Sequence, residues 1–525
     1  MPRPTSLRPA RATTLAWTVD IRPALGAVAL FGLLVLTSLL VRPERAALYY
    51  LALLLAGLAL LPLVVRAVAG TLDLFEPIIP ISLLIVLAYS VRTMYIAYVP
   101  RSIGFGSLAY DDQIAAALLL TMAAYLALVF GYYVLGGALR PKPMSERWFA
   151  GRRWAPALPG WKILVLLGIG TYATRVAAAS GTGLQDVTAA TTLIGFAASS
   201  LQIAACILAL HAAAGHASPW LRFFVWGVAV PLAAWQALTL GGKAYLLSVV
   251  YIVIAARHYV SQRTRLGIVL AITGVAVLTV FPIINVLRVD DPRTVARGAL
   301  VERVAAVLDG FAGMTPAEYM RFAAENTMTR FNGVDALALS MKYNVSDELG
   351  NPMAYAYIPF YAFVPRLVWP DKPVLDQGVR FGQILLIGGF AGASSVTSIG
   401  MYHLADLFVS FGAIGVLIGM MVLGCLYRLV YAFLDPLHTP DAGVKFLYIL
   451  VLWAMVSGFE TDVPTVYSGL LKFLPLWMAI KLWMSRPLPS TALRRPAAPD
   501  PVRSTSVGPA SAGDAAPLHR QALGR

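Results

Sequence analysis

The sequence predicts an all-α protein that crosses a membrane many times. Of its 525 residues, 59% are hydrophobic and 13% carry a charge, and the mean hydropathy is +0.73. A soluble domain carries about twice that charged fraction. The apolar residues also come in runs of about 20, which is the length of a membrane-spanning helix. These values exclude an ordinary soluble enzyme and indicate a polytopic integral membrane protein.

About twelve apolar runs predict the transmembrane helices in order. They lie at 24–41, 46–65, 77–98, 113–138, 161–179, 193–213, 222–240, 244–260, 266–287, 404–434, 444–459 and 465–485. The segment 1–22 is a basic arm without a small-residue cleavage pattern, so the first run is expected to stay as a span. The run at 404–434 is long enough to tilt or break.

The net charge of +15 is explained by topology. A cytoplasmic N-terminus places the basic clusters at 140–153 and 257–265, and the Arg-rich C-terminus, on the cytoplasmic side, as the positive-inside rule requires. We therefore expect a bacterial cytoplasmic (inner) membrane protein with both termini in the cytoplasm. The lipid bilayer accounts for the excess of Lys and Arg, and no nucleic-acid partner is expected.

The predicted domains follow from these spans. A cytoplasmic arm (1–22) precedes spans 1–9 (23–287), a large external or periplasmic loop (288–403), spans 10–12 (404–485) and a disordered cytoplasmic tail (486–525). A structureless loop as long as 288–403 is improbable, so short helices are expected there. The stretch 294–311 has helical apolar spacing, and 354–364 and 381–400 are candidates for re-entrant or interfacial segments.

Motifs of soluble enzymes are absent. The sequence contains no GxxxxGK[ST], HExxH or GxSxG motif, and no dinucleotide-binding GxGxxG after a strand. Cys206 and Cys425 both fall in apolar runs, which supports neither a disulfide framework nor a zinc site. We expect no cofactor and no bound metal.

A proline-framed segment late in the loop, 365–373, is the first candidate site. Its three prolines stiffen the backbone and hold Arg366 and Lys372 on one turn, with Trp369 between them. Such a pair of cations suits a pyrophosphate, and the indole suits a sugar ring or the lipid headgroup level. An interfacial anchor that only meets lipid headgroups is an equally good interpretation.

The second candidate opens the next span. On a helix, His403 and Asp406 share a face, and either can take a proton from a sugar hydroxyl. The alternative is that Asp406 caps or pairs at a helix mouth and that His403 is an ordinary interfacial residue. Three further cations, Arg175, Lys243 and Arg330, lie at the predicted outer face, where each could instead snorkel.

Two other expectations concern charges at that face. Arg92, at outer depth in the third span, is expected to snorkel to the interface. The acidic pair Glu460 and Asp462, on the last external turn, is expected to be solvated.

Together these segments resemble the Wzy-type polymerases of bacterial O-antigen and exopolysaccharide repeat units, which are related to the O-antigen ligases. The resemblance is clearest over about 240–430 and includes the turn at 240–243. The residues that carry it are Pro365, Arg366, Trp369, Pro370, Lys372 and Pro373, then Asp406, Phe408, Ser410, Phe411, Gly412 and Gly415. In that pattern Glu is commoner at position 406, Asn at 410 and Arg at 243.

The resemblance implies a membrane glycosyltransferase of the GT-C type. It would polymerise undecaprenyl-diphosphate-linked oligosaccharides outside the cytoplasmic membrane, with a chain-length regulator and a flippase as pathway partners. Asp406 would be the base, with His403 as second choice, and Trp369 or Tyr402 would stack on sugars. The residues expected to bind the diphosphate are Arg366, Lys372, Arg330, Lys243 and Arg175.

Two alternatives remain open from the sequence. An O-antigen ligase-like transferase would use the same donor but pass the glycan to another acceptor. A flippase or transporter of polyprenyl-linked sugars would make no bond, and it would usually show two related halves. No such halves are visible in the sequence, and the charges cluster at one face.

Overall fold

The computed structural model describes most of the chain. The described residues are 22–99, 111–144, 152–154, 160–179, 189–213, 218–240, 243–260, 309–364, 377–387 and 400–487, with isolated positions within 264–305 and 368–375. The predictions for 1–21, for most of 266–287 and 294–308, for 388–399 and for 488–525 lie outside these ranges.

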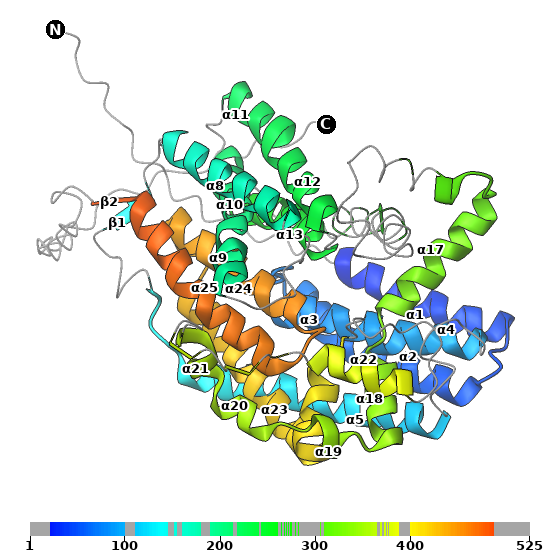
Figure 1. The fold of residues 1–525 in the computed structure, drawn as a ribbon. Coiled ribbons are helices and arrows are strands. Elements are labelled where there is room, and N and C mark those ends of the chain that lie inside the picture. Colours follow the sequence, from blue (N-terminus) through cyan, green and yellow to red (C-terminus); the bar gives the residue numbers. More distant parts are fainter. Residues whose placement is uncertain are drawn as a thin grey trace, which may run out of the picture.

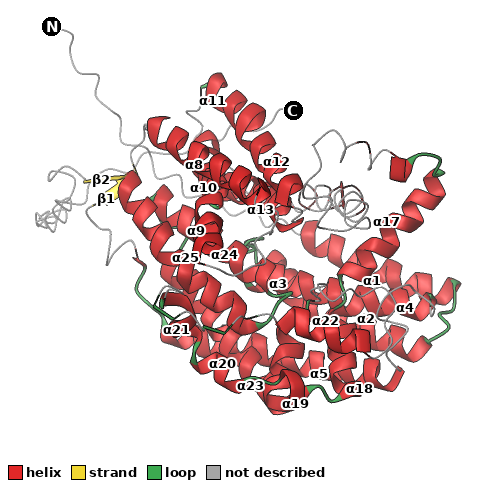
Figure 2. Ribbon diagram, viewed as in Figure 1, coloured by secondary structure: helices red, strands yellow, loops and turns green. Residues whose placement is uncertain are grey.

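The described chain is almost entirely helical (Figure 2). Its first half contains α1 (Arg22–Leu40), α2 (Ala46–Val68), α3 (Ile78–Ile85), the π-helical turn η1 (Val86–Val91), α4 (Arg92–Tyr98), α5 (Asp111–Phe130), the π-helical turn η3 (Gly131–Leu135), α6 (Gly136–Leu139), α8 (Gly160–Ala179), α9 (Ala189–Ala198), α10 (Ser200–Ala213), α11 (Pro219–Phe224), the π-helical turn η5 (Val225–Ala229), α12 (Val230–Leu240) and α13 (Lys243–Val260).

The second half adds the loop helices and the last spans. These are α17 (Pro316–Arg330), α18 (Gly333–Tyr343), α19 (Ser346–Leu349), α20 (Pro352–Ala356), α21 (Ile358–Phe363), α22 (Gln377–Ile387), α23 (Tyr402–Leu434), α24 (Ala442–Gly458) and α25 (Val463–Met484). Strands β1 (Arg152–Trp154) and β2 (Ser485–Pro487) pair antiparallel, with Trp154 opposite Ser485. This strand pair was not predicted.

The fold class of an all-α membrane protein is confirmed at this level. Within the described residues, six helical stretches are long and apolar enough to cross a membrane, at 46–68, 78–98, 111–139, 193–213, 402–434 and 463–484. Shorter apolar helices lie at 24–40, 219–233, 247–260 and 442–458. The observed helices coincide within a few residues with the predicted runs that fall in described parts of the chain, while the total of twelve spans stays a prediction.

The helices form two groups that Figure 1 separates clearly. In one group, α10 packs against α8 and α13, and α12 packs against α8 and α13. In the other, α5 packs against α2, α18 and α23. Helix α24 joins them, because it contacts α10 and α13 on one side and α23 and α25 on the other.

Glycines allow α23 to approach the α5–η3–α6 stretch closely. A Cβ atom at Gly131 would lie 1.9 Å from the backbone oxygen of Met421, and one at Gly424 would lie 2.1 Å from that of Leu128. Helices in a membrane gain stability by such close backbone packing, since lipid tails remove the usual hydrophobic driving force between helices.

Helix α23 is sharply broken near its start. Gly412 has φ 69° and ψ −169°, a conformation that is essentially restricted to glycine. A Cβ at Gly419 would lie 2.5 Å from the side chain of Leu407, although the two positions would be about 18 Å apart on a straight helix. The segment 402–411 therefore folds back against the helix that follows it. The predicted run at 404–434, which is long enough to tilt or break, is broken here, and glycine at position 412 has a structural reason.

The loop between the spans carries the short helices that its length predicted. Helix α17 begins with a capping box in which Thr315 and Glu318 bond each other's backbone, and these bonds lower the pKa of the exposed Glu318. Helices α20 and α21 occupy the stretch predicted as interfacial, and α18 packs against α5 and α23. Helices α18 and α19 thus pack against α23.

Candidate functional site

The folded-back start of α23 is held by the turn between α24 and α25. The backbone N–H of Tyr402 donates to the oxygen of Glu460, and that of His403 donates to the oxygen of Phe459, both at 3.2 Å. The first N–H groups of a helix have no partner within the helix, so this turn satisfies them. Sequence positions near 400 and near 460 are thereby brought into one site.

Asp406 is completely buried in this site. Its Oδ2 accepts a hydrogen bond from the Tyr355 hydroxyl at 2.5 Å and from the Val463 backbone N–H at 2.9 Å, at the start of α25. Burial raises the pKa of the Tyr355 phenol, and the Asp406 carboxyl raises it further, so Tyr355 stays protonated and donates. Among the described residues, Oδ1 of Asp406 has no hydrogen-bond partner.

His403 is equally buried, and its tautomer follows from its one bond. Its Nδ1 lies 2.9 Å from the backbone oxygen of Thr461, which can only accept, so Nδ1 carries the proton. In the neutral ring, Nε2 then keeps the lone pair, and this atom has no partner among the described residues. The ring packs between Phe459 and Tyr467. An uncompensated buried polar atom costs free energy, so two of them one helical turn apart make this a candidate functional site.

Arg330 is brought to the same place by an ion pair. Its guanidinium bonds the carboxylate of Glu460, and its backbone oxygen accepts from the Tyr402 hydroxyl at 3.3 Å. We call this set of residues the His403 cluster: His403, Asp406, Tyr355, Arg330, Glu460 and Tyr402. Three elements that are far apart in the sequence, α17, α20 and α23, thus meet at one turn.

The expectation that Glu460 and Asp462 are solvated is wrong. Glu460 pairs with Arg330 and its side chain is only 17% exposed. Asp462 is buried and caps α25, where its Oδ1 accepts from the Thr465 N–H at 2.8 Å. The acidic residues of this short turn are therefore structural parts of the site, because the turn packs over the start of α23.

The burial of the Arg92 side chain also differs from the prediction. The side chain does not snorkel, but is fully buried, and its Nε donates to Oδ2 of Asp335 at 2.7 Å. Burial raises the pKa of the Asp335 carboxyl, which the neighbouring Arg92 guanidinium opposes. This pair ties the third span to α18 of the loop. Nearby, the ring of Tyr89 packs edge-on against Tyr402, which connects this region with the His403 cluster.

The proline-framed segment lies in the same loop but contacts α21 instead. The Lys372 ammonium donates to the backbone oxygens of Tyr361 at 2.7 Å and Val364 at 3.0 Å, and Trp369 stacks on Tyr361. Lys372 thus holds the last carbonyl groups of α21, which packs against α25. Arg366 lies outside the described residues. The diphosphate and sugar roles of these residues stay predictions.

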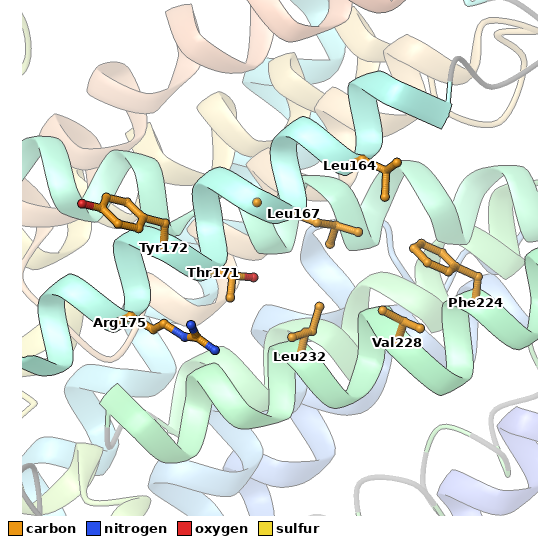
Figure 3. Close-up of a pocket in the computed structure, with 9 residues that line it drawn as sticks. Leu164, Leu167, Thr171, Tyr172, Arg175, Phe224, Val228 and Leu232 are labelled. Carbon is orange, nitrogen blue, oxygen red and sulfur yellow. The ribbon is translucent and has the colours of Figure 1, made fainter.

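The remaining predicted cations lie elsewhere. The backbone of Lys243 begins α13, and its side chain lies outside the described residues. Arg175 is on α8, in the other helix group, and lines a groove between α8 and the α11–α12 stretch (Figure 3). The structure therefore brings Arg330 and Tyr402 to His403 and Asp406, and places Arg175 apart from them.

A second buried carboxylate cluster, at the opposite end of α23, serves as a contrast. Asp73 accepts hydrogen bonds from His258 at 2.9 Å, Tyr259 at 3.0 Å and Tyr431 at 2.8 Å. Burial raises the pKa of Asp73, but these partners outweigh it, so the pKa lies below its usual value. Both of its oxygens are satisfied, so this cluster stabilises the fold and has no free group for a substrate.

Comparison with known proteins adds no further assignment. No family model, curated protein or solved structure matches this chain. Within the described residues, no group of three or more His, Cys, Asp or Glu side chains could hold a metal ion.

Proposed function

We propose that the His403 cluster is the reaction centre of a membrane glycosyltransferase that polymerises polyprenyl-diphosphate-linked oligosaccharides at the outer face of the cytoplasmic membrane. The observation that carries the proposal is a buried carboxylate and a buried neutral imidazole, three residues apart, each with one free basic atom. The motif around Asp406 that resembles the Wzy-type polymerases supports it.

The proposed reaction needs one proton transfer and one departing anion. The acceptor sugar hydroxyl attacks the anomeric carbon of the donor glycan, and a new carbon–oxygen bond forms while the bond to the diphosphate oxygen breaks. The hydroxyl proton passes to Oδ1 of Asp406 or to Nε2 of His403, the two free atoms. The polyprenyl diphosphate leaves as an anion, which the nearby Arg330 would stabilise.

Substrate access requires the site to open. Asp406 and His403 are fully buried, and Tyr355 of the short helix α20 bonds the Asp406 carboxyl. We expect the five-residue helix α20 to move aside when a sugar enters, because it contacts α23 through Tyr355, whose hydroxyl bonds Asp406 and whose ring packs against Phe411. A site that closes in this way excludes water, which protects a lipid-linked donor from hydrolysis.

Asp406→Asn is expected to abolish polymerisation without unfolding the protein. The Asn side-chain oxygen can still accept from Tyr355 and from Val463, but the amide cannot take a proton at the free position. Cells that carry this variant should hold normal amounts of the protein, contain no long glycan and accumulate single repeat units. The measurement is glycan length by gel together with protein abundance in the membrane.

The matched control is Asp435→Asn at the other end of α23. Asp435 adopts a left-handed conformation that Asn tolerates well, and it contacts only the exposed His438 through its side chain among the described residues. This variant should make chains of normal length. Long chains from Asp406→Asn would overturn the proposal.

A further inference from the structure

The molecule carries a groove lined mainly by apolar side chains in the helix group that contains α8 and α12, separate from the group of α23. It lies between α8 and the α11–η5–α12 stretch and has a volume of about 490 Å³ (Figure 3). The residues used below are Leu164, Leu167, Thr171, Arg175, Phe224 and Leu232. Leu164 of α8, which lines the groove, is 62% exposed, and Phe223 of α11, next to the lining residue Phe224, is 64% exposed. A large exposed apolar surface around an apolar groove is typical of contact with lipid tails.

The shape of the groove fits one extended hydrocarbon chain. It follows α8 from Leu164 to Arg175, which corresponds to about 16 Å along a helix, roughly half the thickness of the hydrocarbon core of a bilayer. Leu167, Phe224 and Leu232 make its walls apolar. A hydrocarbon chain that lies in this groove would therefore contact the protein across the thickness of one leaflet.

Arg175 supplies a charge at one end of the groove. It is the one charged residue among those that line the groove, and its exposed guanidinium reaches toward α12 in Figure 3. Within the described part of the chain, no ion pair or hydrogen bond of Arg175 is found. Thr171, one helical turn away, presents a hydroxyl to the same groove. A guanidinium beside a hydroxyl is suited to a phosphate group, which the fork of Arg can bind through two parallel hydrogen bonds.

The predicted topology places Arg175 near the outer end of α8. It lies four residues before the helix ends at Ala179, which puts the guanidinium at headgroup depth. An occupant with a phosphate at Arg175 and a tail along Leu167 and Leu164 would therefore sit in the outer leaflet.

The proposed polymerisation reaction needs a binding site for the lipid of the acceptor. The donor loses its diphosphate at the reaction centre, but the acceptor reacts at its non-reducing end, one repeat unit away from its own diphosphate. Its lipid must then be held at a distance from Asp406. We propose, resting on the function proposed above, that this groove binds the polyprenyl chain of the acceptor lipid and that Arg175 pairs with the acceptor's diphosphate.

The test compares lipid-linked and lipid-free acceptors. With a preformed long-chain donor, Arg175→Gln should raise the half-saturating concentration of a lipid-linked repeat unit about tenfold, because one charge-assisted contact is lost. The maximal rate should stay within about twofold. The rate with the free repeat-unit oligosaccharide, which has no lipid to bind, should not change. Equal effects on both acceptors, or no effect on either, would contradict the inference.

The control and a direct binding assay separate this inference from the proposed function. Arg222→Gln removes the same charge from α11, outside the residues that line the groove, and should leave both acceptors unaffected. Polyprenyl diphosphate without sugar should bind the purified wild type and bind Arg175→Gln about tenfold more weakly, even if no polymerisation is observed. Displacement of this probe by an equal concentration of phosphatidylglycerol would show a site for general anionic lipids and overturn the inference.

Discussion

Replacing Asp335 by Ala is expected to destabilise the protein by about 3–5 kcal/mol, because it leaves the Arg92 guanidinium buried without its counter-charge. Both side chains have 0% exposure, so water cannot take the place of the lost carboxylate. The helix α18 that carries Asp335 packs against α5 and α23, so its displacement should also disturb the start of α23. The measurement is thermal unfolding of the purified protein in detergent.

Two further variants make this result specific. Asp347→Ala removes an exposed carboxylate from the next helix, α19, and should leave the unfolding temperature unchanged. The double variant Arg92→Leu with Asp335→Leu should regain most of the lost stability, because buried ion pairs are often replaceable by apolar residues. If Asp335→Ala were as stable as Asp347→Ala, the buried pair would not exist as described.

Gly131→Ala is expected to be the second most damaging change. The added Cβ would lie 1.9 Å from the backbone oxygen of Met421, so the η3 turn and α23 would have to separate. Overpacking of this kind costs about 1–3 kcal/mol or more, and here the obstacle is backbone and cannot rotate away. The expected result is a lower unfolding temperature and less protein in the membrane.

The matched control is Gly137→Ala, six residues further along the same stretch. A Cβ atom there would meet nothing within 4 Å, so this variant should be neutral or slightly stabilising, as Ala favours helix over Gly. Equal behaviour of the two variants would mean that α23 does not approach η3 as closely as the structure indicates.

The sequence predicted the helices well because apolar runs are a local signal. The predicted run at 113–138 corresponds to 111–139, and the run at 465–485 corresponds to α25. The position of His403 and Asp406 one helical turn apart was also accessible, since helical spacing alone places them on one face. The length of the run at 404–434 allowed for a tilt or a break, but only the structure places the break at Gly412.

Contacts between distant segments could not be predicted in this way. Arg92 was expected to snorkel, because depth along a span says nothing about Asp335, which lies in another segment. Tyr355 was missed, since one Tyr in an irregular apolar stretch carries no signal of its contact with Asp406. Glu460 was expected to be solvated because turns usually are, and only the packing over α23 buries it.

The proposed polymerisation at the His403 cluster is tested most directly by a reaction with purified components. The wild-type protein in lipid vesicles receives one polyprenyl-diphosphate-linked repeat unit, with no nucleotide and no added metal. We expect a ladder of longer glycans, each one repeat unit apart, from the wild type and only the starting unit from Asp406→Asn. Transfer of the intact lipid across the vesicle membrane without any ladder, or an equal ladder from Asp406→Asn, would contradict it.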